Sequence, residues 1–112
     1  MKILEKEIKR EELKNAKNLL NDEMVKAVVD VEKEIIGVDA EMHADIEQML
    51  LANGSNQDAL CGSNLWLEEE GDDFIEFDSM INIRPRQGNR SRGVENPETQ
   101  QKIKEVVTKW IK

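Results

Sequence analysis

Met24-Val-Lys-Ala-Val-Val-Asp-Val31 is the stretch from which the fold of this chain is best argued, because Val25, Ala27, Val29 and Val31 recur at every second residue. A period of two is that of a β-strand, in which successive side chains point to opposite faces of a sheet. Residues 34–39 form a second apolar run after a short polar turn. The two runs predict a β-hairpin. Its turn type and register stay open, because no Asn-Gly or Asp-Gly pair marks the turn.

The apolar period changes to that of a helix beyond the hairpin. The residues that fall at i, i+4, i+7 and i+8 are Met42, Ile46, Met49 and Leu50. We expect this helix to start near Ala40 with Asp39 as its N-cap. Asn53 and Gly54 supply residue types that end helices.

The remaining stretches predict shorter elements around this centre. Residues 3–4 suit an edge strand, and residues 11–20 a helix with Leu13, Ala16 and Leu20 on one face. Residues 55–64 are polar and predict a loop, and residues 65–67 a short strand. The clearest strand pattern is residues 75–83, where isoleucine and phenylalanine alternate with polar side chains.

The residues at its start predict the C-terminal helix. Asn96 suits an N-cap, Pro97 the first helical position and Glu98 the positive end of the helix dipole. Its apolar stripe is Ile103, Val106, Val107 and Trp110. The predicted order is therefore (β)-α-β-β-α-β-β-α in one domain of residues 1–112. We expect an α+β fold with a small, mostly antiparallel sheet and its helices packed on one face.

Composition limits the classes of function. The chain has 112 residues and a net charge of −8, which disfavours whole-surface attraction to nucleic acid or to an anionic membrane. One cysteine, Cys61, allows no internal disulfide, and neither a signal peptide nor a membrane span is expected. The predicted location is the cytoplasm. We expect no bound metal and no cofactor. The oligomeric state stays open.

The segment Arg84-Pro-Arg-Gln-Gly-Asn-Arg-Ser-Arg-Gly93 is chemically distinctive. Four arginines and no acid lie between Ser79 and Val94, so the rest of the chain carries −12. The planar guanidinium group matches carboxylate or phosphate, and glycine and serine allow backbone N–H groups to approach an anion. The candidate ligand-binding residues are Asn82, Arg84, Arg86, Gln87, Asn89, Arg90 and Arg92. The ligand would be an anionic small molecule, a nucleic-acid backbone or an acidic protein segment.

A structural explanation of the arginines stands beside this one. Seven acidic residues lie just upstream, between residues 68 and 78, without an intervening base. These acids could pair with the arginines inside the fold, and exposed pairs of this kind are common.

An enzymatic alternative uses the acidic strand face and the single histidine. Glu76, Asp78 and His43 are candidate acid and base groups, with the arginines steadying substrate charge. The competing explanations are a solvent-facing strand surface and a surface histidine in an acidic first helical turn. Cys61 or Ser79 paired with His43 matches no known nucleophile signature. We lean against an enzyme.

Four segments resemble one protein family: residues 24–33, His43-Ala-Asp45, Asn53-Gly-Ser55 and residues 77–94. The family is an uncharacterised prokaryotic one, the domain of unknown function numbered fifty-six seventy-four. The likeness covers most of residues 24–112. It implies a small cytosolic protein and no activity, so it carries no catalytic role to any position.

The preferred hypothesis is a binding module for an anionic ligand or acidic partner. The alternatives are a small hydrolase or transferase, and an oligomeric or partner-stabilised accessory protein. Trp66, beside the acidic turn, would mark the surface of the last of these.

Overall fold

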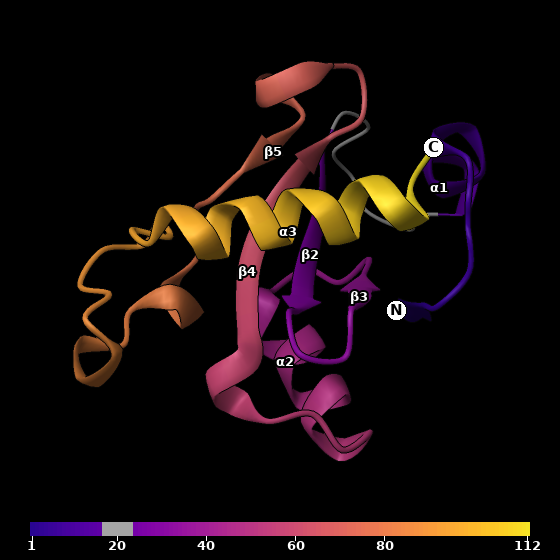
Figure 1. The fold of residues 1–112 in the computed structure, drawn as a ribbon. Helices are drawn as coiled ribbons and strands as arrows, with labels where there is room; N and C mark the ends of the chain where they lie inside the picture. Colours follow the sequence, from indigo (N-terminus) through magenta and orange to yellow (C-terminus); the bar gives the residue numbers. More distant parts are fainter. Residues whose placement is uncertain (17–23) are drawn as a thin grey trace.

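The computed structural model describes residues 1–16 and 24–112, which contain a five-stranded antiparallel sheet (Figure 1). In spatial order its strands are β1 (Lys2–Leu4), β3 (Ile35–Val38), β2 (Met24–Asp30), β4 (Leu60–Trp66) and β5 (Ile75–Glu76). The α+β class and the antiparallel sheet are thereby confirmed.

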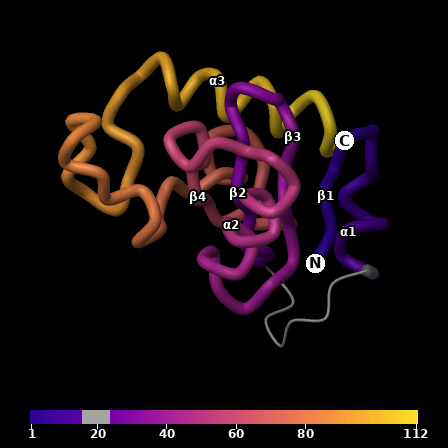
Figure 2. Tube along the Cα trace, turned by 90° about the horizontal axis from the view of Figure 1, so that it is seen from below, coloured from indigo at the N-terminus to yellow at the C-terminus, as the bar shows by residue number. Residues whose placement is uncertain are grey.

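Both faces of the sheet are covered by helices, and the prediction of helices on one face is wrong. The helices are α1 (Arg10–Ala16), α2 (His43–Ala52) and α3 (Pro97–Trp110). One core cluster joins α1 and α3 to Val25, Ala27 and Val29, and the other joins α2 to Val28. Figures 1 and 2 show α3 and α2 on opposite sides of β2 and β4. The physical reason is that β2 is a central strand and is buried on both faces, whereas its period of two suggested one.

The close approach of α2 depends on a glycine in β3. A Cβ atom at Gly37 would collide with the side chain of Ile46 and press on Met49 and Leu50. A larger residue would push α2 away from the sheet, so this glycine sets the distance between α2 and the sheet.

The hairpin of β2 and β3 is confirmed, with Val28 opposite Gly37. The strand at Ile3 and Leu4 is confirmed too, since β1 pairs with β3. In the predicted helix of residues 11–20, α1 accounts for the first part and buries Leu13. Leu20 and the rest of that stretch lie outside the described residues.

The predicted N-cap of α3 is confirmed, whereas the predicted N-cap of α2 is wrong. Asn96 caps α3 as predicted, since its Oδ1 accepts from Glu98 N at 2.8 Å and Thr99 N at 3.3 Å. However, α2 begins at His43, so Asp39 is not its N-cap; Asp39 has a left-handed backbone with φ of 72°. The turn out of β3 uses the residues that sequence spacing assigned to the first helical turn.

The largest error concerns strands β4 and β5. Residues 60–64 were predicted as loop but form most of β4, which pairs with β2 along its whole length. Residues 75–83 were predicted as a strand, but β5 stops at Glu76 and a 3₁₀ turn follows at Met80–Asn82. The described helices include none long and apolar enough to cross a membrane.

Candidate functional site

The loop after β5, residues 77–96, runs along the outer edge of β4 and completes the sheet with side chains instead of backbone. Asn82 is 4% exposed, and its Oδ1 accepts from Gly62 N at 2.8 Å. Its Nδ2 donates to Gly62 O at 2.9 Å and to Arg92 O at 2.8 Å. An amide side chain carries the same donor and acceptor as a peptide group, so Asn82 takes the place of a neighbouring strand there.

Arg84 makes a similar contact with β4 two residues before Gly62, at Leu60. Its Nη1 donates to Leu60 O at 2.6 Å, and its Nη2 lies 3.4 Å from Glu47 Oε2, on α2. The two side chains are only 15% and 11% exposed. Arg84 is therefore used by the fold, as a cap on β4 and a tie to α2.

Gly62 allows the loop to lie this close. A Cβ atom there would stand 2.5 Å from the Cβ and the Oγ of Ser79. Ser79 is buried, and its Oγ accepts from Ile81 N at 3.3 Å. The segment Leu60-Cys-Gly-Ser-Asn64 looks like a loop in sequence because its small residues make room for this contact.

Asn89 holds the loop in shape from within. Its Nδ2 donates to Asn82 O at 2.7 Å and Gly93 O at 2.8 Å, and its Oδ1 accepts from Glu95 N at 2.8 Å. Backbone bonds also join Arg84 and Asn89 in both directions. The loop is thus braced internally although it has little regular secondary structure.

A backbone anion site was expected in this loop, and an internal carboxylate occupies it. Glu95 Oε2 accepts from Arg90 N at 2.7 Å and from Ser91 N at 3.0 Å. These two backbone bonds lower the pKa of Glu95 from its ordinary value of 4.5. The loop therefore supplies its own anion to these N–H groups.

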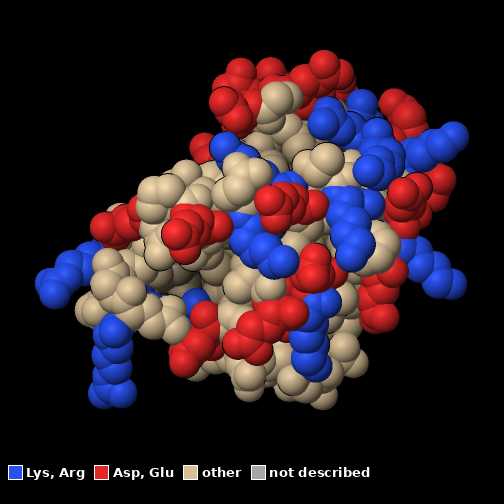
Figure 3. Space-filling model, viewed as in Figure 1, with Lys and Arg blue, Asp and Glu red and all other residues tan. Residues whose placement is uncertain are grey.

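The other three arginines are exposed, and they differ in their partners. Arg92 Nε lies 2.6 Å from Asp78 Oδ1. The guanidinium groups of Arg86 and Arg90 make no ion pair or hydrogen bond within residues 1–16 and 24–112. Figure 3 shows basic side chains that project from the loop at the left of the molecule. Arg86 and Arg90 are thus the loop arginines without an ion pair in the described part of the chain, and the charge of Arg90 still acts on the Glu95 carboxylate.

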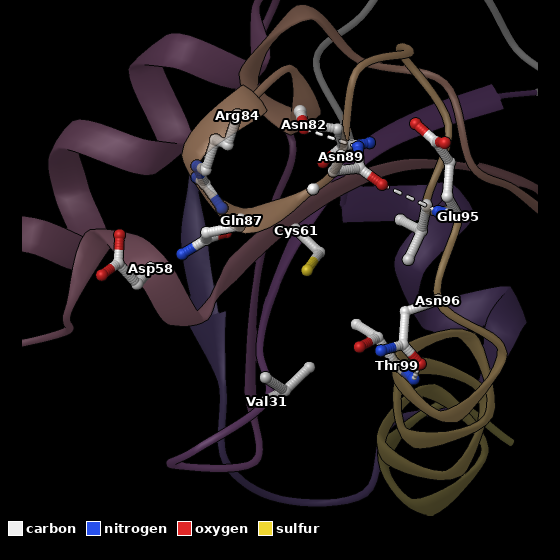
Figure 4. A pocket seen from close by; sticks show the side chains of 12 residues that line it. Val31, Asp58, Cys61, Asn82, Arg84, Gln87, Asn89, Glu95, Asn96 and Thr99 are labelled. Atoms are coloured by element: carbon white, nitrogen blue, oxygen red, sulfur yellow. Dashed lines mark hydrogen bonds between the residues drawn. The ribbon is translucent and has the colours of Figure 1, made fainter.

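A pocket of about 210 Å³ opens beneath the loop (Figure 4). Its walls come from the loop, from the turn after β2, from the approach to β4 and from the first turn of α3. Its lining residues are Val31, Asp58, Cys61, Asn82, Arg84, Gln87, Gly88, Asn89, Val94, Glu95, Asn96 and Thr99. The pocket therefore lies at the boundary between the braced loop and the body.

The three candidate acid and base residues lie elsewhere and are each engaged. Glu76 Oε1 accepts from Asn64 Nδ2 at 2.8 Å, and Asp78 pairs with Arg92. His43 is buried, which corrects the expectation of a surface histidine, and its Nε2 lies 2.8 Å from Ser63 O. None of the three lines the pocket.

The two candidate nucleophiles do not reach the histidine. Cys61 packs in the cluster on the α3 side of the sheet, whereas His43 lies on α2 at the other face. Ser79 Oγ serves its own 3₁₀ turn. Among the described residues, no group of three or more His, Cys, Asp or Glu side chains is placed to hold a metal ion.

Comparison with known families places the chain. The model of the family DUF5674, described as a protein of unknown function, matches residues 2–110.

The chain belongs to this family.

The DUF5674 match covers more of the chain than the likeness seen in residues 24–112. No match was found among curated proteins or among solved structures. The family description names no activity.

We expect the stability of this DUF5674 chain to depend on pH through its only histidine. Burial lowers the pKa of His43 from 6.5, opposed by the bond to Ser63 O; Lys26, Asp78 and Arg92 are the charges that act on it. Because the folded state binds this proton less readily than the unfolded state, stabilisation is complete above pH 6.5 and falls as the pH drops through the folded pKa.

Chemical denaturation on both sides of pH 6.5 measures this dependence. The variant His43→Gln keeps a donor for Ser63 O but has no imidazole to protonate, so its stability should change less over the same range. Equal slopes for the two proteins would show that His43 is not the responsible group.

Sequence reasoning missed four residues of this region: Gly62, Glu47, Glu95 and Thr99. Gly62 could have been suspected from its place between small polar residues, because glycine in a strand often marks a close approach. Glu47 gave no signal, since its partner Arg84 is 37 residues away. Of the seven predicted ligand residues, Asn82, Arg84 and Asn89 hold the loop together.

Proposed function

We propose that the protein is a binding module that takes an acidic segment of a partner protein on Arg86 and Arg90, with Arg92 beside them. The observation that carries this proposal is the contrast within the loop. Arg84 is largely buried and pairs with Glu47, whereas Arg86 and Arg90 are exposed and their guanidinium groups make no ion pair within residues 1–16 and 24–112. Arg90 does interact electrostatically with the Glu95 carboxylate.

The bracing of the loop supports a binding role. The hydrogen bonds of Asn82, Asn89 and Glu95 hold the backbone on both sides of Arg86 and Arg90. A backbone already held in place loses less conformational freedom when a partner binds. The planar guanidinium group then meets a carboxylate with two parallel hydrogen bonds.

Charge favours a short acidic segment over nucleic acid. Because the chain outside residues 79–94 carries −12, a long polyanion that leaves the loop meets repulsion. At physiological salt this repulsion acts over about 8 Å, so a short segment avoids most of it. A free phosphate ion would have to compete with Glu95 for the backbone N–H groups of Arg90 and Ser91.

A groove beside Arg86 adds an apolar component. It has a volume of about 470 Å³. Its apolar walls come from Met80, Ile81, Ile83 and Pro85, and the rest of its lining is polar and includes Glu47 and Asp58. Met80 is 65% exposed and Ile83 is 38% exposed. We expect the partner segment to place an apolar side chain here next to its acidic ones.

The test is binding of a hexaglutamate peptide at low salt. The double replacement Arg86→Gln and Arg90→Gln should weaken binding roughly tenfold, because each exposed pair contributes up to about 1 kcal/mol. Physiological salt should weaken binding to the native loop further.

The matched control replaces Lys9 and Lys112, which are exposed and lie near the chain ends, by glutamine. It removes the same charge and should bind as the native protein does. Equal losses in the two double variants would mean that only net charge matters, and the proposal would fail.

A further inference from the structure

The pocket beneath the loop is a second candidate site. It shares Asp58, Arg84 and Gln87 with the groove beside Arg86, but neither Arg86 nor Arg90 lines it. Segments distant in sequence build it: Val31 follows β2, Cys61 lies in β4, and Thr99 lies in α3. Figure 4 shows Cys61 and Thr99 pointing toward the same space, with Gln87 and Asp58 at the opposite wall.

The polar groups around this space fall into two sets. Those of Asn82, Arg84, Asn89, Glu95 and Asn96 already make hydrogen bonds within the loop, to β4 or to α3. A second set makes no side-chain hydrogen bond or ion pair within the described ranges, 1–16 and 24–112. Its members are Asp58, Cys61, Gln87 and Thr99. The pocket thus retains unused hydrogen-bonding capacity on several sides.

Charge restricts what could bind. Arg84 is balanced by Glu47, and the Glu95 carboxylate is held by two backbone N–H groups. Asp58 is exposed, so water solvates its carboxylate at the rim. Gln87, which is exposed, and Thr99, which is half-buried, are neutral and can each donate and accept. A net anion gains nothing from this set.

We propose that the pocket binds a small neutral molecule that carries hydroxyl or amide groups. A volume of about 210 Å³ holds roughly seven waters at the volume a water takes in the liquid. That is room for one small polyol, monosaccharide or simple amide. Val31 and Val94 offer an apolar wall to its carbon skeleton.

The experiment is an amide NMR titration of the full chain with glycerol, ribose, glucose and acetamide, each into the millimolar range. At least one of the four should give saturable shifts centred on Cys61, Gln87 and Thr99. The same probe should slow the reaction of the Cys61 thiol with a small thiol reagent.

Two variants separate occupancy of the pocket from general solvent effects. Thr99→Leu fills the space and removes the hydroxyl group, so the affinity for the probe should fall at least tenfold. Thr108→Leu is the matched control on an exposed position of the same helix and should leave it unchanged. Gln87→Leu provides a second test should Thr99→Leu alter the native spectrum.

The proposal is overturned if none of the four probes gives a saturable shift, or if Thr99→Leu and Gln87→Leu both bind as the native chain does. These outcomes are separate from those for the hexaglutamate peptide, because Arg86 and Arg90 do not line this pocket.

Discussion

Replacement of Asn82 by alanine should lower the free energy of unfolding by about 3 kcal/mol. The side chain is 4% exposed and makes three hydrogen bonds. Alanine cannot replace them, and the N–H and C=O of Gly62 would be left buried without partners. An unpaired buried polar group costs about 1 to 3 kcal/mol.

Urea denaturation of Asn82→Ala beside Asn53→Ala measures this effect. Asn53 is exposed at the end of α2, so its replacement should change stability by less than about 0.5 kcal/mol. If the two variants were equally stable, the side chain of Asn82 would not be completing the sheet edge.

Replacement of Arg84 by methionine should cost about 3 kcal/mol or more. Methionine retains the apolar stem but removes the partner of Glu47, whose side chain is 11% exposed. Breaking a buried ion pair on one side leaves an uncompensated charge, and this typically costs about 3 to 5 kcal/mol. The carbonyl of Leu60 also loses its donor.

The double variant Arg84→Met with Glu47→Met should recover much of that loss, because no buried charge then remains unpaired. The coupling energy from the four proteins, measured by denaturation, isolates the pair. Additive losses, with no recovery in the double variant, would contradict a buried interaction between α2 and the loop.

The parts of the fold that sequence predicted well are those set by local signals. The hairpin of β2 and β3 follows from strand periodicity, and α3 follows from Asn96 and Pro97 at its start. In both cases the deciding contacts join residues close in the chain. Local patterns therefore suffice for them.

The edge of the sheet could not be predicted because its contacts are distant in sequence. Residues 75–83 alternate like a strand, yet beyond Glu76 the β4 edge is met by side chains of Asn82 and Arg84. Conversely, the sequence of β4 looks like a loop because it contains Gly62, whose missing side chain leaves room for the close contact with residues 79–82. Tertiary packing overrode the local pattern in both places.

The partition of the arginines was also beyond sequence reasoning. The upstream acids were the alternative partners for these arginines, and the structure shows such an ion pair between Asp78 and Arg92. Asp72 pairs instead with Lys104 of α3. The partner of Arg84 is Glu47, which lies on α2. Which charges remain free depends on helix placement and not on charge spacing.

The most direct measurement of the proposed function is an amide NMR titration of the native chain with hexaglutamate at low and then physiological salt. We predict saturable shifts concentrated on the loop between Arg84 and Arg92 that diminish with salt. Shifts spread over the lysines of α3 and the chain ends, or no saturable shift in the loop, would contradict a binding site at Arg86 and Arg90.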